Sequence, residues 1–227
     1  MTETKQRMEQ IVTGPMEPQE LGMVVDVLAR ALRDNPSFIG MFGPKPGRRL
    51  RSTRILCRMI LSGQSEPPTV ARLAGVVVGA AAVSPPQTCF YCGARWRHYR
   101  INIAGRGFTI ESEVSFRELL RLLRLGLPAL HRAGVMGRLS AVHDPQVRHW
   151  HVELVGVEPD LQGRGIGGTL MEAALRGPDA AGEPASVDTD TTRNVEFYRR
   201  LGFEVTATEE PLGVKAWYME RPAVLGR

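Results

Sequence analysis

The stretch that decides the fold is Gln162-Gly163-Arg164-Gly165-Ile166-Gly167-Gly168-Thr169, which holds four glycines in eight residues. It follows an apolar run from Val152 to Val157 and precedes a helical pattern from Leu170 to Leu175. Glycines in such a turn let backbone N–H groups come close to a bound anion, and the dipole of the following helix favours negative charge at the same place. The sequence therefore predicts a phosphate-binding turn between a strand and a helix.

Two nucleotide motifs explain this turn poorly. A nucleotide P-loop has the spacing of Gly163–Gly168, but Thr169 stands where its lysine belongs. The same glycines satisfy a dinucleotide fingerprint literally, and Asp188 lies about 20 residues further on, where a ribose-binding acid is sought. However, the polar segment Glu158–Gln162 separates the strand from the glycines, and too little chain follows Asp188 for a doubly wound sheet. We therefore favour a different phosphate compound.

Two longer segments together indicate which one. Residues 155–167 read Val-Gly-Val-Glu-Pro-Asp-Leu-Gln-Gly-Arg-Gly-Ile-Gly. They resemble the acetyl-CoA-binding motif of the GNAT superfamily of N-acetyltransferases: a strand, a Val-x-Pro exit, then Gln/Arg-x-x-Gly-x-Gly/Ala before a helix. Residues 194–203, Asn-Val-Glu-Phe-Tyr-Arg-Arg-Leu-Gly-Phe, resemble the Asn…Phe-Tyr-x-x-x-Gly-Phe motif of that family, in the same order and at its usual separation. Within residues 150–220 the resemblance is nearest to members similar to puromycin N-acetyltransferase.

The resemblance implies an α/β fold with one domain, whose central mixed sheet is splayed between two parallel strands and flanked by helices. The length of 227 residues suits one domain with a sizeable core. We expect a polar segment at residues 1–17 and a single acetyltransferase domain at residues 18–227. Within it, residues 150–220 are the expected acetyl-CoA-binding core, and residues 84–148 are an expected helical elaboration.

Hydrophobic periodicity predicts the individual elements. We expect helices at Leu21–Leu32, Arg48–Leu61, Ser115–Leu125, Pro128–Ala141, Thr169–Leu175 and Arg193–Leu201, and strands at Val70–Leu73, Val76–Val83, His149–Val157, Ala185–Thr189, Phe203–Thr208 and Val214–Met219.

The parallel strand pair carries the expected cofactor site. The resemblance implies that the strands diverge at Val155–Val157 and Asp188–Asp190, and that pantetheine inserts there like an added strand. Gly156 marks either a bulge that opens the pair or a point of close packing. Asn194 either binds the pantetheine, as the resemblance implies, or caps its own helix. The expected cofactor-binding residues are Val155, Gly156, Val157, Gln162, Gly163, Arg164, Gly165, Ile166, Gly167, Gly168 and Asn194.

Three residues are candidates for proton transfer. The resemblance implies that Tyr198 is the general acid that protonates the leaving thiolate, whereas the alternative is an aromatic ring that only packs beside Phe197. Glu153 is our candidate base, acting through water, and His151 is the second, because two ionisable residues in an apolar strand are unusual. Asp188 is a weaker candidate. The alternative is a structural hydrogen bond between His151 and Glu153.

Strand periodicity also predicts how these side chains face. Period two places His149, His151, Glu153 and Val155 on one face of their strand, and Trp150, Val152 and Leu154 on the other.

Composition limits the setting. The net charge of +5 suits an enzyme that binds a polyanionic cofactor, and no nucleic-acid motif accompanies it. No apolar run is long enough for a membrane span, residues 1–10 are too polar for a signal peptide, and three cysteines suggest a reducing compartment. We therefore expect a cytoplasmic protein without nucleic-acid or membrane partners, as a monomer or a homodimer. Cys89 and Cys92 have zinc-ligand spacing but no second pair, so we expect no metal.

These observations predict an acetyl-CoA-dependent N-acetyltransferase. It would transfer an acetyl group directly to an amine of a small molecule or peptide, because no cysteine in the two motifs is available for an acetyl-enzyme. The alternative from another class is a non-catalytic acyl-CoA-binding or sensory module with the same fold.

Overall fold

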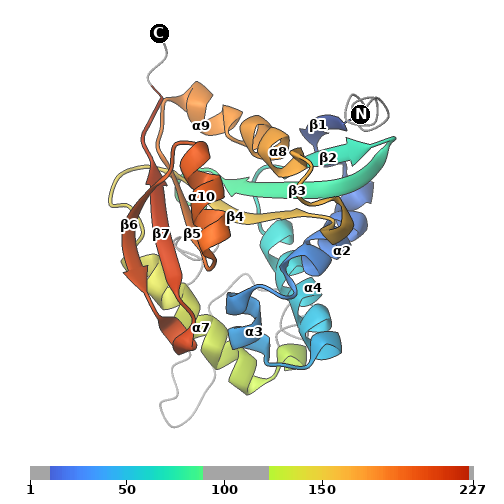
Figure 1. Cartoon of the computed structure of the whole chain (residues 1–227), viewed down its shortest axis with the longest axis vertical. Helices are drawn as coiled ribbons and strands as arrows, with labels where there is room; N and C mark the ends of the chain where they lie inside the picture. Colours follow the sequence, from blue (N-terminus) through green and yellow to red (C-terminus); the bar gives the residue numbers. More distant parts are fainter. Residues whose placement is uncertain (1–10, 89–122, 225–227) are drawn as a thin grey trace, which may run out of the picture.

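A mixed sheet organises the chain. The structure, a computed structural model, describes residues 11–88 and 123–224. In that part the sheet has seven strands in the order β1-β2-β3-β4-β5-β7-β6, and β4 and β5 form its parallel pair (Figure 1). The strands are β1 (Ile11–Pro15), β2 (Thr69–Leu73), β3 (Val76–Ser84), β4 (Trp150–Val157), β5 (Ala185–Thr189), β6 (Glu204–Glu209) and β7 (Ala216–Arg221). The expected mixed sheet with one parallel pair is confirmed.

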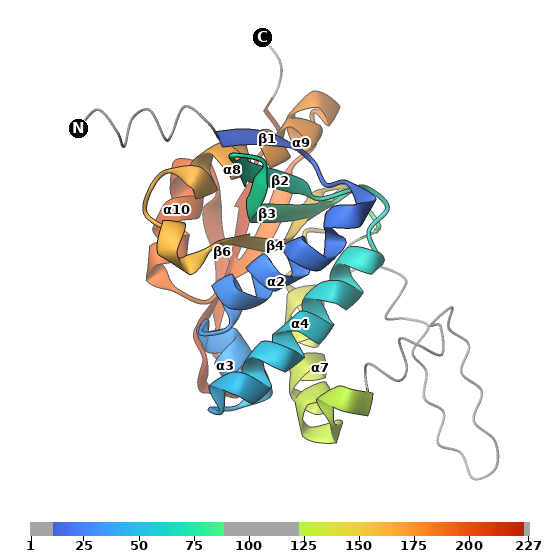
Figure 2. The ribbon, with the colours of Figure 1, turned by 90° about the vertical axis from the view of Figure 1, so that its right-hand side faces the viewer.

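Helices cover both faces of this sheet. Figures 1 and 2 show α2 and α4 on one face, and α8, α9 and α10 on the other. Two helices, α3 and α7, contact each other beyond the central strands. The helices are α2 (Leu21–Leu32), α3 (Pro36–Phe42), α4 (Pro46–Ser62), α7 (Leu127–Val142), α8 (Ile166–Ala174), α9 (Arg176–Ala181) and α10 (Thr192–Arg200), and the 3₁₀ turns are η1 (Pro18–Glu20), η2 (Pro159–Leu161) and η3 (Pro211–Gly213).

Two apolar cores result from this layering. Strand β3 serves both, because its side chains alternate: Ala80 and Ala82 pack with Leu28 of α2, whereas Ala81 packs with Leu170 of α8. Alanines on a buried strand let a helix approach each face closely. The α2 side also contains side chains of α4, and the α8 side contains side chains of α10.

Three elements were not predicted. Strand β1 lies within the expected polar segment 1–17 and pairs antiparallel with β2 from Ile11 to Pro15. Helix α3 begins at Pro36, and proline suits the first turn of a helix because that turn needs no donor from its nitrogen. Helix α9 follows α8 with almost no interruption. Most of the helix expected at Ser115–Leu125, like Cys89 and Cys92, lies outside the described residues.

Candidate active site

The parallel strands separate where the sequence predicted. Residues of β4 and β5 pair at Trp150–Ala185, His151–Ser186 and Val152–Val187, and no further pair follows in the described residues. The two strands therefore diverge toward their carboxyl ends, which opens a gap in the sheet beyond Val152 and Val187. Ligands of open α/β sheets bind outside the carboxyl ends of such strands.

The bulge in β4 is at Glu153, not at Gly156. Ala82 of β3 pairs with Leu154 and Val83 pairs with Val152, so that Glu153 is the additional residue. The regular two-residue alternation is interrupted there, and Leu154 packs in the α2 core while Val152 packs in the α8 core. The prediction that these two residues share one face is therefore wrong, because periodicity alone assumes an uninterrupted ladder.

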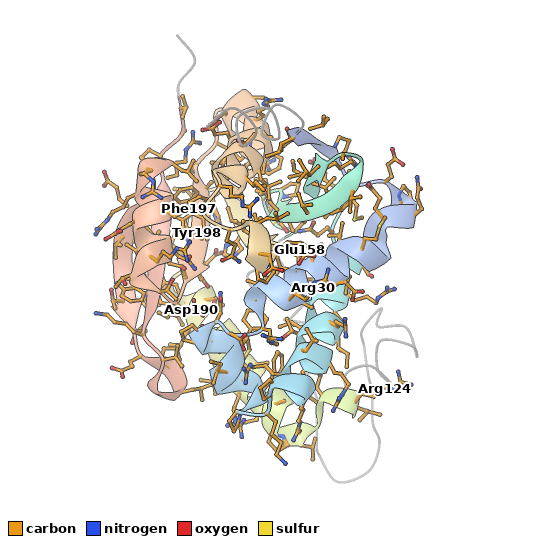
Figure 3. All side chains as sticks on the ribbon, turned by 45° about the vertical axis from the view of Figure 1, so that its right-hand side comes forward. Arg30, Arg124, Glu158, Asp190, Phe197 and Tyr198 are labelled. Carbon is orange, nitrogen blue, oxygen red and sulfur yellow. The ribbon has the colours of Figure 1, made fainter. Side chains whose placement is uncertain are left out.

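Gly156 has the other of its two expected roles. A Cβ atom added there would lie 2.8 Å from the Ala31 Cβ atom and 3.1 Å from the Leu28 Cδ2 atom. Helix α2 thus packs directly on the backbone of β4. The Arg30 guanidinium of α2 also donates to the carboxylate of Glu158, just after β4, with Nε at 3.2 and 3.1 Å from its two oxygens (Figure 3).

The glycine turn presents a row of backbone donors. Gly163 and Gly165 have φ values of +76° and +84°, which favour glycine, and Gly165 is the N-cap of α8. Helix α8 begins at Ile166, three residues before the prediction. Among the hydrogen bonds of the described residues, none is donated by the six backbone N–H groups of Gly163–Gly168 to another backbone carbonyl. This row lies at a helix N-terminus, the arrangement that binds phosphate groups.

Two side chains of this turn hold it in place. The Gln162 Nε2 atom donates to the carbonyl of Val157 at 3.0 Å, and the Arg164 Nη2 atom donates to the carbonyl of Asp160 at 3.2 Å. The side chain of Ile166 is buried in the α8 core, so only its backbone faces a ligand position. The side-chain contacts of Gln162, Arg164 and Ile166 therefore stabilise the turn itself.

A cavity of about 150 Å³ lies where β4 and β5 separate. Glu153, Val155, Asn194 and Tyr198 line it, so the structure brings together these four residues that the sequence singled out. The other lining residues are Leu32, Asn35, Ser37, Phe38, Met41, Leu56, Ile60, Met136, Ser140, Val152, Leu154, Val187, Asp188, Thr189, Asp190, Ala216 and Tyr218.

Three carboxylates line the cavity. Ser84 Oγ donates to Glu153 Oε1 at 2.9 Å, the backbone N–H of Ser37 donates to Asp190 Oδ2 at 2.8 Å, and the hydroxyl of Ser140 donates to Asp188. Burial raises the pKa of Asp188 above its usual range, although the nearby charge of His151 opposes the shift. Asp190 was not among the predicted site residues. Its position directly after β5, a strand that ends where the parallel pair diverges, could have identified it.

Tyr198 occupies the side of the cavity formed by α10. Its ring packs edge-on against Phe197 and Phe203, with centroid separations of 5.2 and 5.5 Å, and 7% of the residue is exposed. Burial first, and then the negative charges of Asp190 and Asp188, raise the pKa of the Tyr198 hydroxyl above its usual value. The hydroxyl therefore stays protonated near neutral pH.

Asn194 does not cap its helix. The N-cap of α10 is Thr191, whose Oγ1 atom accepts a hydrogen bond from the backbone N–H of Asn194 at 3.2 Å. The local explanation for an asparagine at this position is therefore wrong, and its side chain is among those that line the cavity.

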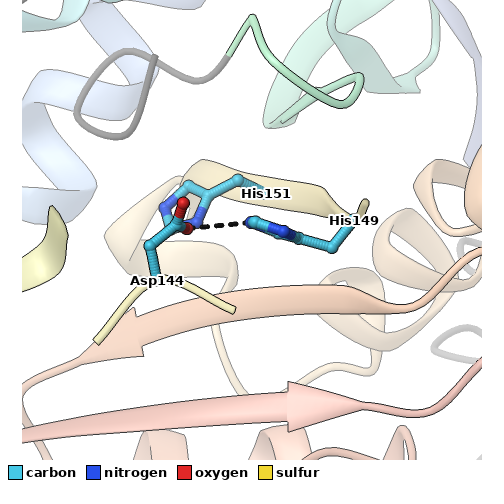
Figure 4. Close-up of side chains that lie close together, drawn as sticks. All are labelled: Asp144, His149 and His151. Carbon is cyan, nitrogen blue, oxygen red and sulfur yellow. Dashed lines mark ion pairs between the residues drawn. The ribbon is translucent and has the colours of Figure 1, made fainter. Parts of the chain in front are cut away.

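His151 lies outside the cavity lining. Its Nδ1 atom is 2.8 Å from Ser186 Oγ, whereas Glu153 accepts from Ser84, so the side chains of the two candidate bases contact different serines. His151 is grouped with Asp144 and His149 (Figure 4). The His149 Nε2 atom is 2.8 Å from Asp144 Oδ1; although burial opposes the charged form, hydrogen bonds to Asp144 and Val147 raise the pKa of His149.

Known proteins are similar to this chain in sequence and in fold. The family described as the acetyltransferase (GNAT) domain matches residues 129–205, which include the glycine turn and Tyr198. Over these residues the chain is similar to members of the GNAT superfamily. The peptidyl-lysine N-acetyltransferase YjaB of Salmonella typhimurium is 38% identical over 60 residues, which are 26% of this chain and 40% of that relative. Members of the superfamily use acetyl-CoA.

Solved structures show the same fold. One is the histone acetyltransferase HPA2 and related acetyltransferase of Corynebacterium glutamicum, with a TM-score of 0.63, 20% identity, and coverage of 96% of this chain and 98% of that chain. Another is the polyamine N-acetyltransferase of Drosophila melanogaster, with a TM-score of 0.56, 20% identity, and coverage of 92% and 98%. In the described part of the chain, no helix has the length and apolar character needed to span a membrane.

Proposed function

We propose that this protein transfers the acetyl group of acetyl-CoA directly to an amine of a small molecule or peptide. The observation that carries the proposal is the divergence of β4 and β5, which opens a cavity lined by Glu153 and Tyr198. The phosphate-type turn at Gly163–Gly168 follows β4 within one short 3₁₀ turn. A long cofactor with an anionic end and a reactive thioester end fits this succession. The same proposal includes a single domain with its cofactor core at 150–220; because β1 belongs to the sheet, this domain extends from the expected residues 18–227 back to Ile11.

The backbone supplies the cofactor seat in this proposal. The N–H groups of Gly163–Gly168 bind the pyrophosphate, with the α8 dipole adding to the attraction. Backbone groups of Val155 and Val157 bond the pantetheine amides along the edge of β4 that β5 leaves unpaired. Asn194 reaches the pantetheine from the opposite side, because it lines the cavity and does not cap α10. Gly156 contributes by letting α2 pack closely, not by a side contact.

The reaction requires two proton removals and one proton donation. The acceptor ammonium, whose ordinary pKa is near 10, loses one proton to Glu153, through water, before its nitrogen attacks the thioester carbon. The tetrahedral intermediate then loses a second nitrogen proton as the carbon–sulfur bond breaks. Tyr198 donates its hydroxyl proton to the leaving sulfur and is reprotonated from the medium. The net products are an amide, coenzyme A thiol and one proton.

Glu153 is preferred to His151 as the base because of position. Glu153 lines the cavity, while His151 faces Ser186 and the cluster with Asp144 and His149. His151 retains a second role in the proposal: its charge lies near Asp188, which lines the cavity.

Amine-dependent release of coenzyme A thiol tests the proposal. With acetyl-CoA and a panel of primary amines, the protein should release thiol in proportion to amine, and mass spectrometry should find the acetylated amine. Tight acetyl-CoA binding without amine-dependent release would instead favour the non-catalytic acyl-CoA-binding module.

The setting proposed is the cytoplasm. Cys57 is a free, fully buried cysteine, and burial raises the pKa of its thiol to about 12, so it is inert as a nucleophile. A free buried thiol suits a reducing compartment.

A further inference from the structure

The cavity has two chemically different walls. The strand wall, from β4 and β5 to the residue after β5, supplies all three of its carboxylates, Glu153, Asp188 and Asp190. The helix wall, defined here by its apolar side chains, consists of Phe38 and Met41 of α3, Leu56 and Ile60 of α4 and Met136 of α7, with Ser37 and Ser140 as polar neighbours on α3 and α7. A ligand that fills the cavity therefore meets negative charge on one side and hydrocarbon on the other.

The negative charges of Asp188 and Asp190 on the strand wall have little compensation. Asp190 accepts from a backbone N–H and Asp188 from a serine hydroxyl, both neutral donors. Neither forms any of the ion pairs found among the described residues, and the described lining contains no lysine, arginine or histidine. The nearby charges that favour the ionised form of Asp188 are those of His151 and, to a smaller extent, His143, neither of which lines the cavity. Buried carboxylates attract a cation strongly and repel an anion.

We propose that the acceptor is a small primary amine with a single ammonium group on an alkyl or aryl body, and with no carboxylate. The inference rests on the proposed function, and it adds the acceptor class. The ammonium faces Glu153, Asp188 and Asp190, and the apolar body packs against the α3, α4 and α7 side chains. A free amino acid brings a carboxylate to the same acids, and a diamine places its second charge against the apolar wall.

Three compounds of equal length test this recognition: hexylamine, 1,6-diaminohexane and 6-aminohexanoate. Their far ends are apolar, cationic and anionic, respectively. We expect the kcat/KM of acetylation to be highest for hexylamine, about 10-fold lower for the diamine and about 100-fold lower for 6-aminohexanoate. Equal or better use of 6-aminohexanoate would overturn the proposal.

A carboxylate placed on the apolar helix wall, and a neutral amide at the same position, provide a matched pair of variants. Met136 is half-buried on α7 and lines the cavity, so it tolerates a polar replacement better than the fully buried residues around it. Met136→Glu should raise the ratio of diamine to hexylamine kcat/KM by at least about 10-fold, because the new carboxylate receives the second ammonium. Met136→Gln has nearly the same shape and polarity without the charge, and should leave the ratio close to that of the wild type.

Calorimetric binding of the three compounds to the coenzyme A-loaded protein separates the two proposals. If the enzyme acetylates these compounds but does not prefer hexylamine, the acceptor class is contradicted and the acetyltransferase function is supported. If no compound is acetylated but the three bind in the expected order, with hexylamine tightest, the acetyltransferase function is contradicted and the proposed amine recognition is supported. If hexylamine is neither acetylated nor bound selectively, the acceptor class is overturned, even if other amines are acetylated.

Discussion

Replacement of Gly156 by alanine tests the close packing of α2 on β4, the strand that carries Glu153. The added Cβ atom would lie 2.8 Å from the Ala31 Cβ atom, whereas carbon atoms in contact are ordinarily about 3.5–4.0 Å apart. Either α2 or β4 must therefore move by roughly 0.7 Å or more. Overpacking of a core by one methyl group costs about 1–3 kcal/mol in the free energy of unfolding. For a chain of this size we expect the melting temperature to fall by about 2–12 °C.

Two matched variants accompany this one in thermal and urea denaturation. Gly168→Ala adds the same methyl group inside α8, where no atom lies within 4 Å, and should be neutral or stabilising by up to about 1 kcal/mol. Adding Ala31→Gly to Gly156→Ala removes the closest contact, so the double variant should show a favourable coupling of about 0.5–3 kcal/mol. A Gly156→Ala protein as stable as Gly168→Ala, or additive effects in the double variant, would refute the close packing of α2 on β4.

Three further predictions concern the proposed chemistry. Gly165→Val should weaken acetyl-CoA binding in calorimetry, because a branched residue cannot easily keep φ at +84° and adds bulk beside the pyrophosphate donors; a folded variant with unchanged affinity would remove the turn from the site. Tyr198→Phe should lower kcat by roughly 10²–10⁴ with little change in acetyl-CoA affinity, and wild-type turnover would leave Tyr198 with packing alone. Glu153→Gln should lose turnover near neutral pH and recover part of it at high pH, where more amine is unprotonated; a Glu153→Gln enzyme that keeps its neutral rate while His151→Gln loses it would make the histidine the base.

Local signals made the cofactor side of the site predictable. The glycines of residues 163–168 indicate a turn whose conformation only a few residue types tolerate. Two of them, Gly163 and Gly165, have positive φ values, which favour glycine. The segment from Asn194 to Phe203 likewise carries its helix and its terminal glycine in consecutive residues. Both features depend on short stretches of chain, so sequence alone placed them within a few residues.

The acceptor side depends on partners that are distant in sequence. The bulge at Glu153 arises from the register with Ala82 and Val83, more than 60 residues earlier, and no pattern within β4 reveals it. Asp190 and the helix wall meet only when α3 and α7 pack beyond the strand ends. Periodicity gave each strand and helix a buried face, but it could not say which faces enclose one cavity.

A crystal structure of the protein with coenzyme A measures the central claim most directly. We expect pyrophosphate oxygens at the N–H groups of Gly163–Gly168, pantetheine along β4 in the gap left by β5, and sulfur beside the Tyr198 hydroxyl. Pantetheine that lies outside this gap, with its sulfur away from Tyr198 and Glu153, would contradict it.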